Sequence, residues 1–158
     1  MVIFLAELNG LKLYATDVGN AYLEAKTRER VCVYGGPEFQ DLGLKGHLLV
    51  LVRALYGLKS SGARWHERFA NTLHEEGFTP CKADRDVWIH RKDDHYEYIC
   101  VYVDDLAIAM TDPAEFCDKL INKYGYKLKG VGPLEYHLGC DFGRDPDGTF
   151  YYGPHTYV

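Results

Sequence analysis

Two adjacent carboxylates, Asp104 and Asp105, lie between two apolar runs at residues 98–101 and 106–110. Such runs, rich in Val, Ile and Tyr, predict two half-buried strands with the Asp pair at the tip of the hairpin between them. Two unit charges ~4 Å apart repel by roughly 4 kcal/mol at an effective dielectric constant of about 20. A bound cation or an incoming partner would relieve that repulsion, so the pair is a candidate metal site; the alternative is an ordinary turn, which Asp also favours.

A second Asp pair, Asp93-Asp94, shows what the ordinary turn looks like in this chain. Polar residues flank it on both sides, in the run RKDDH at residues 91–95. This setting is typical of a solvated hairpin turn. We therefore assign chemistry to Asp104-Asp105 and none to Asp93-Asp94.

Length and composition fit one soluble globular domain over residues 1–158. The chain is 47% hydrophobic and 26% charged, and no apolar run approaches the ~20 residues of a membrane span. Its first six residues lack the basic start of a secretory signal, so we expect an intracellular protein with no membrane partner. The net charge of −5 argues against a surface that coats nucleic acid generally, although local basic residues could still line a groove.

Cysteine and histidine show no metal-binding spacing. The five cysteines are scattered, with no C-x-x-C pair, and they read as free thiols. The seven histidines form no H-E-x-x-H pattern. Zinc is therefore not expected, and oxygen ligands are the ones to consider.

Periodicity and capping signals predict the elements that position the Asp pair. We expect helices near residues 2–8, 60–76 and 112–124, the last with Asp112 as its cap, Pro113 at its first position and Gly125 at its end. Strands are expected at residues 11–16, 31–34, 48–52, 134–142 and 149–152, besides the two that flank the pair. This order predicts an α+β fold, an antiparallel sheet with helices on one face.

A third carboxylate, Asp17, closes the early strand at residues 11–16. Three aspartates near one sheet edge fit two-metal phosphoryl chemistry, because hard cations prefer oxygen ligands and two ions ~3.5–4 Å apart stabilise both attacking and leaving oxygens. Spacing and composition do not say which phosphoryl reaction this is.

Four segments in order resemble motifs of the reverse transcriptase of copia-type LTR retrotransposons. These segments are residues 16–22 (TDVGNAY), 54–60 (ALYGLKS), 102–105 (YVDD) and 138–142 (LGCDF). The resemblance covers nearly the whole chain. It implies the palm of a right-hand polymerase with partial fingers, and RNA-directed DNA polymerase chemistry by two Mg²⁺ (or Mn²⁺) ions.

The resemblance also implies roles for the carboxylates and for the residue after the first of them. Asp17 and Asp104 would be the principal metal ligands, Asp105 the third carboxylate, and the backbone carbonyl of Val18 a further ligand. The metal pair would favour attack by a primer 3′ hydroxyl on a deoxynucleoside triphosphate, with release of pyrophosphate.

Further residues match nucleotide-binding and primer-binding segments of that family. Tyr22 would lie under the incoming sugar, although periodicity alone favours a core aromatic. Tyr56 and Gly57 would pack on the nascent base pair; without the family, a turn before a helix explains them equally well. Lys129, with Lys127 as its competitor, would reach the base or the triphosphate. The primer-grip hairpin would contain Leu138, Gly139 and Cys140.

The chain departs from the family's usual pattern at residues 60–64 (SSGAR), so no template contact is assigned there. The basic finger strands would precede Met1, and thumb and RNase H regions would follow Val158. The resemblance therefore implies a fragment of a longer polyprotein that also contains an integrase. Its implied partners are RNA or DNA template with primer, and its implied location is a cytoplasmic virus-like particle.

Two other functions stay open from the sequence. The first is a non-catalytic remnant or interaction domain that keeps the palm fold. The second is another two-metal enzyme, such as a nucleotide cyclase or a nuclease, which the carboxylates would also permit.

Overall fold

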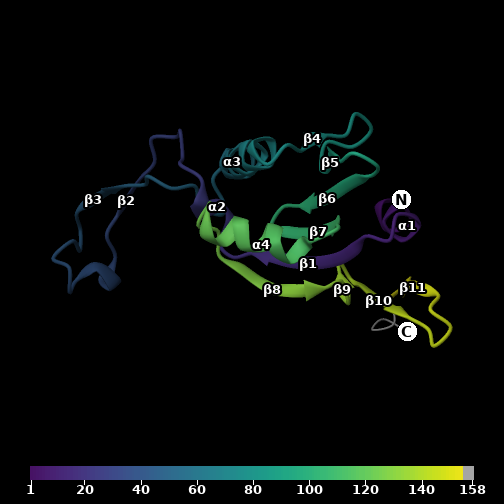
Figure 1. The fold of residues 1–158 in the computed structure, drawn as a ribbon. Helices are drawn as coiled ribbons and strands as arrows, with labels where there is room; N and C mark the ends of the chain where they lie inside the picture. Colours follow the sequence, from purple (N-terminus) through teal and green to yellow (C-terminus); the bar gives the residue numbers. More distant parts are fainter. Residues whose placement is uncertain (155–158) are drawn as a thin grey trace. The chain divides into compact units, whose positions relative to one another are not determined.

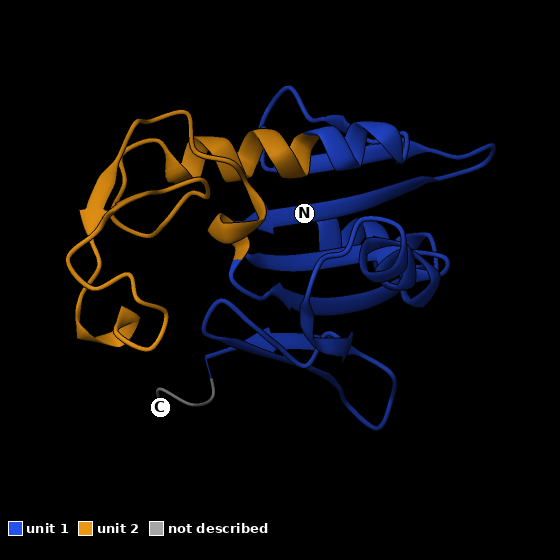
Figure 2. Ribbon diagram, turned by 90° about the vertical axis from the view of Figure 1, so that its left-hand side faces the viewer, with its two compact units in different colours: residues 1–20, 71–158 blue, residues 21–70 orange. Residues whose placement is uncertain are grey.

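The computed structural model describes residues 1–154, which divide into two compact units (Figure 2). Unit 1 holds residues 1–20 and the chain from residue 71 onward, and unit 2 holds residues 21–70. The single palm and partial-fingers domain expected over residues 1–158 stays a prediction, and each unit is described by itself.

Unit 1 holds the helices α1 and α4 and most of the strands (Figure 1). Helix α3 (Ser61–Glu75) begins in unit 2 and ends in unit 1. The other elements of unit 1 are α1 (Val2–Leu8), β1 (Lys12–Val18), β4 (Thr79–Pro80), β5 (Val87–Arg91), β6 (Tyr96–Tyr102), β7 (Asp105–Met110), α4 (Pro113–Asn122), β8 (Leu128–Pro133), β9 (Tyr136–His137), β10 (Cys140–Arg144) and β11 (Phe150–Gly153). Unit 2 has α2 (Ala21–Glu24), β2 (Cys32–Tyr34), the 3₁₀ helix η1 (Pro37–Phe39) and β3 (Leu48–Val50).

A six-stranded sheet is the centre of unit 1, with the strand order β4-β5-β6-β7-β1-β8. Every neighbouring pair in it is antiparallel. The predicted α+β fold with an antiparallel sheet is therefore confirmed. The Asp pair and Asp17 lie on or next to strands β6, β7 and β1. Each of these strands has a hydrogen-bonded neighbour on both sides, so the candidate site is in the interior of the sheet.

One face of this sheet packs on α4 and on the last residues of α3, which belong to unit 1. Ile99 and Ile108 are opposite each other on β6 and β7, and both are fully buried. Trp88 lies opposite Ile99 on β5, and the ring of His74 in α3 meets it edge-on at 5.1 Å. On α4, Phe116 packs 5.7 Å from the ring of Phe78, and that ring lies 5.0 Å from His90 of β5.

The other face carries α1. Cross-strand neighbours share a face, so Tyr98, Ala109 and Leu13 line it together. Buried Ala6 of α1 packs against this row, with Leu5 beside it. The prediction of helices on one face is therefore correct for the two long helices and wrong for α1. The apolar side chains of α1 are buried against the opposite face of the sheet.

Local signals place the helices well. Asp112 caps α4 by accepting the backbone N–H of Glu115 at 3.1 Å, and Pro113 is the first helical residue, as predicted. In α3, residues Trp65, Phe69 and Leu73, spaced by four, are at most 2% exposed, so the helix predicted near residues 60–76 buries one face. The α4 helix ends at Asn122, earlier than expected.

Three strand predictions need correction, and β4 and β5 were not among the predicted strands. Strand β1 runs to Val18, so Asp17 lies within it and does not end it. Strand β8 was not predicted, because two glycines and a proline in LKGVGP are unusual for a strand; it is an edge strand, where such residues are tolerated. The expected strand at residues 134–142 is broken into β9 and β10 by a turn at Leu138-Gly139, where both φ angles are positive.

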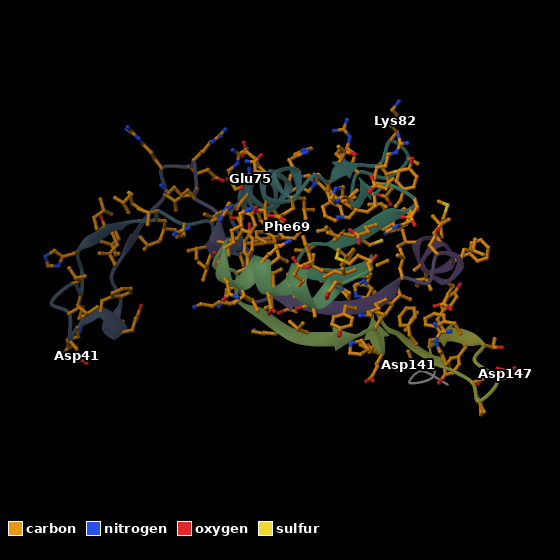
Figure 3. The ribbon with its side chains drawn as sticks, viewed as in Figure 1. Asp41, Phe69, Glu75, Lys82, Asp141 and Asp147 are labelled. Carbon is orange, nitrogen blue, oxygen red and sulfur yellow. The ribbon has the colours of Figure 1, made fainter. Side chains whose placement is uncertain are left out.

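A small three-stranded sheet follows β8, with the order β11-β10-β9. Asp141, near the start of β10, and Asp147, in the turn after it, mark the two ends of its longer hairpin in Figure 3. Aromatic rings stabilise this hairpin, since Phe142 stacks on Tyr152 at 5.9 Å. The β9–β10 turn is the segment predicted as a primer-grip hairpin, and a hairpin is what the structure has there.

Charge is distributed unevenly between the units. Residues 21–70 contain eight Lys and Arg but only five Asp and Glu, whereas the rest of the chain contains ten and eighteen. The net charge of −5 therefore comes from unit 1, where the carboxylates of the candidate site lie. Unit 2 by itself is basic.

No helix within residues 1–154 is long and apolar enough to cross a membrane.

Candidate metal and catalytic site

The sheet register brings the three predicted carboxylates together. Asp17 of β1 lies directly opposite Asp105 of β7. Beside them, the backbone N–H of Val18 donates to the carbonyl of Asp104 at 2.8 Å, which fixes the hairpin tip against the end of β1. The Asp pair and Asp17, far apart in sequence, are neighbours in the structure.

The hairpin tip itself is strained. A two-residue turn, Val103-Asp104, joins β6 to β7, and Val103 has φ of +56°. A positive φ suits the first position of the tight hairpin turns, where Gly is the usual residue. A β-branched residue there costs about 1–3 kcal/mol, and such strain is concentrated at functional sites.

The groups around Asp17 shift its pKa. The pKa of Asp17 is raised, first by desolvation and then by the negative charge of Asp104, with a smaller effect from Asp105. The ammonium group of Lys129 acts in the opposite direction and lowers this pKa. Asp17 therefore has neighbours of both signs, and added positive charge would favour its ionised form.

A cleft of ≈ 410 Å³ opens beside Asp17 and Asp105. Its walls come from β1, from β8 and from the β9–β10 hairpin, and they include Thr16, Lys129, Tyr136, His137, Leu138 and Gly139. The cleft therefore joins the carboxylates to the lysine and hairpin that were predicted as nucleotide-binding and primer-binding.

His137 was not predicted as a site residue. It is half-buried in the cleft wall, and desolvation lowers its pKa while Asp105 raises it. The imidazole therefore lies near enough to a predicted metal ligand to feel its charge. It lacked any recognisable ligand spacing, so only the three-dimensional structure reveals it.

Lys129, and not its competitor Lys127, is the lysine at Asp17. Lys129 lies opposite Asp17 across the β1–β8 ladder. Lys127 contributes its backbone carbonyl, which accepts the N–H of Gly19 at 2.7 Å. A Cβ atom at Gly19 would lie 2.9 Å from Cε of Lys129 and 3.1 Å from that carbonyl oxygen, so Gly19 gives the lysine room.

The donor set fits a hard divalent cation, because carboxylate oxygens with a backbone carbonyl are what Mg²⁺ and Mn²⁺ prefer. Within residues 1–154, however, no three His, Cys, Asp or Glu side chains are grouped so that they could hold a metal ion. Asp17 and Asp105 are cross-strand neighbours, and Asp104 lies in the adjoining turn. Their role as ligands, and that of the Val18 carbonyl, stays a prediction.

The remaining predicted nucleotide-binding residues belong to unit 2. The rings of Tyr22 and Tyr56 lie 4.3 Å apart, so this unit brings those two together. Gly57 follows with φ of +93°, a backbone conformation that residues other than glycine rarely adopt.

Hydrogen bonds from two serines hold the loop that contains Tyr56. The hydroxyl of Ser61 donates to the carbonyl of Leu55 at 2.6 Å, and the carboxylate of Glu29 accepts the backbone N–H of Ser60 at 2.9 Å. The Ser60 hydroxyl donates to the same carboxylate, and these bonds lower the pKa of Glu29. Ser60 and Ser61, at the start of α3, thus act as donors to the neighbouring segments.

Comparison with known proteins gives a consistent result. The family model described as "Reverse transcriptase (RNA-dependent DNA polymerase)" matches residues 1–154. The chain is 31% identical over 133 residues to the retrovirus-related Pol polyprotein from transposon RE1 of Arabidopsis thaliana, which covers 84% of this chain and 9% of that protein.

Two yeast proteins are also similar. The putative transposon Ty5-1 protein of Saccharomyces cerevisiae is 27% identical over 144 residues, covering 90% of this chain and 46% of its own length. The transposon Ty1-MR1 Gag-Pol polyprotein is 28% identical over 137 residues, covering 84% and 7%. The chain thus spans less than half the length of each of these relatives.

Proposed function

This chain belongs to the reverse transcriptase family, as the resemblance to copia-type elements predicted, and from that premise we propose that it is the RNA-directed DNA polymerase domain of a transposon polyprotein. Its reaction would be nucleotidyl transfer from a deoxynucleoside triphosphate to a primer 3′ hydroxyl. The observation that supports this most is the pairing of Asp17 with Asp105 beside Asp104, at one end of a central antiparallel sheet. That arrangement suits the palm of a right-hand polymerase.

Asp17, Asp104, Asp105 and the carbonyl of Val18 would hold two Mg²⁺ or Mn²⁺ ions. When bound, such ions lower the cost of deprotonating the hydroxyl and neutralise charge on the triphosphate. The chain's own contribution is to hold the carboxylates in register on rigid strands. It also places a positive charge, Lys129, next to them, where it can neutralise the triphosphate.

The remaining residues would hold the substrates. Tyr22, Tyr56 and Gly57 would contact the incoming nucleotide and the nascent base pair. The β9–β10 hairpin, with Leu138, Gly139 and Cys140, would hold the primer. It lines the same cleft as Asp105, which supports a role at the primer end.

By analogy with relatives whose names are Pol and Gag-Pol polyproteins, we propose that integrase and RNase H regions flank this domain. A virus-like particle in the cytoplasm would be its place of action.

Single-nucleotide incorporation tests the proposal. With a template-primer, one labelled deoxynucleotide and Mg²⁺, we expect the primer to lengthen by one residue, and EDTA to stop the reaction. Only short products are expected with all four nucleotides, because duplex binding depends on many phosphate contacts and the chain as a whole is acidic. No incorporation with either Mg²⁺ or Mn²⁺ would favour a non-catalytic remnant, and long products would contradict the processivity prediction.

Thermal unfolding gives a test of the metal site without activity. Millimolar Mg²⁺ should raise the Tm, since an ion that binds only the native state stabilises it, by about 2.7 kcal/mol at one hundred times its Kd. Asp104→Asn should reduce that gain. The matched control is Asp93→Asn, in the exposed turn between β5 and β6, which should keep it in full. Equal gains in both variants would argue against metal binding at the carboxylates.

A further inference from the structure

The pairing of β1 with β8 is irregular between Ala15 and Asp17. Ala15 and Asp17, two residues apart on β1, face Gly132 and Lys129, three residues apart on β8. β8 thus contains one extra residue at this point, which is a β-bulge. Gly130 lies within it and has φ of +62°, the conformation that a glycine-type bulge requires.

A side chain pins this bulge. Thr16, the β1 residue between Ala15 and Asp17, is only 5% exposed, and its hydroxyl donates to the carbonyl of Lys129 at 2.9 Å. This hydrogen bond gives the Lys129 carbonyl, at the start of the bulge, a partner. A buried threonine that bonds a neighbouring strand's backbone resists any slip of that strand.

The bulge changes where Lys129 points. Each residue added to one strand re-aims the side chains beside it, and bulges are common next to active sites for this reason. Here Cε of Lys129 lies over Gly19, 2.9 Å from where a Cβ would be, and Nζ lies 3.5 Å from that point. The lysine head group thus extends past the end of β1, beside Asp17, in a place that only a glycine leaves open.

We propose that Gly130 and Thr16 are positioning residues that aim the Lys129 ammonium group at the end of β1, where the triphosphate of the incoming nucleotide would lie. The aim of the lysine follows from the geometry above, and its use on a triphosphate rests on the proposed function. Both residues would act through Lys129.

Two pairs of variants test this. Gly130→Ala forces a side chain into the positive-φ position, and its control is Gly132→Ala on the same strand, where φ is not positive and no atom lies within 4 Å of the new Cβ. Thr16→Val removes the hydroxyl at nearly constant shape, and its control is Thr16→Ser, which keeps the hydroxyl. Should Gly130→Ala fail to fold, the threonine pair decides the question alone.

The first readout is independent of activity. Lysines labelled by reductive ¹³C-methylation give separate NMR signals, and Lys129→Arg assigns that of Lys129. We expect Gly130→Ala and Thr16→Val to move the Lys129 signal, and Gly132→Ala and Thr16→Ser to leave it in place. An unmoved signal in both test variants overturns the proposal.

The second readout is single-nucleotide addition. We expect KM for the nucleotide to rise about tenfold in the two test variants and less than about twofold in the controls, with a smaller change in kcat, because a charge-assisted contact to phosphate is lost. A wild-type protein that adds no nucleotide would refute the proposed function, and the NMR result would still decide whether Gly130 and Thr16 aim Lys129. An equal rise in KM for test and control variants would contradict the proposal.

Discussion

Asp17→Asn is expected to lower the kcat of nucleotide addition strongly and, at the same time, to raise the Tm of the metal-free protein at neutral pH. The loss of activity follows from the removal of a carboxylate at the place where positive charge must be held during the reaction. Loss of one such electrostatic group lowers kcat by roughly 10²–10³-fold. Single-nucleotide incorporation with saturating Mg²⁺ measures this effect.

The gain in Tm follows from the raised pKa of Asp17. Burial and the charge of Asp104 raise that pKa above the unfolded value of 3.8, so between the two values the native state binds more protons than the unfolded state. Stability must then fall as the pH rises through the folded pKa, and at pH 7 the ionised Asp17 is a net cost. Asparagine carries no charge and removes that cost.

Thermal unfolding in EDTA at pH 4 and at pH 7 checks the sign. The Tm of the variant should exceed that of the wild type by more at pH 7 than at pH 4. Asp93→Asn is the matched control for both effects, because it changes an exposed aspartate roughly 20 Å away, at the other end of the seven-residue strand β6. A variant that is less stable than the wild type at pH 7 would show that Asp17 has a structural role.

Ile99→Ala is expected to cause a large loss of stability in the central sheet. Ile99 is fully buried at the centre of β6, between Ile108 of β7 and Trp88 of β5. Removing a buried side chain of this size leaves a cavity and costs about 2–5 kcal/mol. Domains are stable by only about 5–15 kcal/mol, so this is a large share of the total.

Urea unfolding measures the effect, and Ile121→Ala is the control. Ile121 is in α4 and is 40% exposed, so the same change there should cost less than about 0.5 kcal/mol. At temperatures where Ile99→Ala is still folded, its Mg²⁺-induced gain in Tm should persist, because the carboxylates remain in place. Equal losses in the two variants would mean that the sheet can close around the missing side chain.

Local patterns were sufficient to predict the parts of the site that depend on neighbouring residues. The apolar runs on either side of Asp104-Asp105 predicted a hairpin with the pair at its tip; the structure has the hairpin, with Asp104 in its turn and Asp105 as the first residue of β7. Polar neighbours likewise predicted an exposed turn at Asp93-Asp94, where the structure has the β5–β6 turn. Helix α4 was equally predictable, because its cap and its first proline act within one turn.

Long-range register was not predictable. The opposition of Asp17 and Asp105 joins residues far apart in the chain, and a slip of one residue would have turned one carboxylate to the other face. His137 was missed for a related reason, since its place near Asp105 depends on how the β9–β10 hairpin lies beside β1. The strand pattern placed Asp17 near the same sheet edge as the Asp pair, and the resemblance gave it the role of a metal ligand; the structure shows the register that sets it opposite Asp105.

Strand β8 shows the limit of propensity arguments most clearly. Its glycines and proline argue against a strand, yet they are tolerated because the strand has a partner on one side only. The glycines that made this strand hard to predict include Gly130, which forms its bulge. The bulge at Gly130 and the placement of Lys129 both depend on them.

The two outer strands of the six-stranded sheet also determine how this protein behaves in concentrated solution. An open edge invites pairing with a second copy, and short strands, bulges, prolines and lysines prevent it. Strand β4 has two residues, one of them Pro80, and β8 has a bulge, Pro133 and Lys129. Neither of these two strands offers a long straight run of free backbone groups, so the sheet should resist self-association. A change that removed the bulge from β8 would leave a straighter edge for a second copy to pair with.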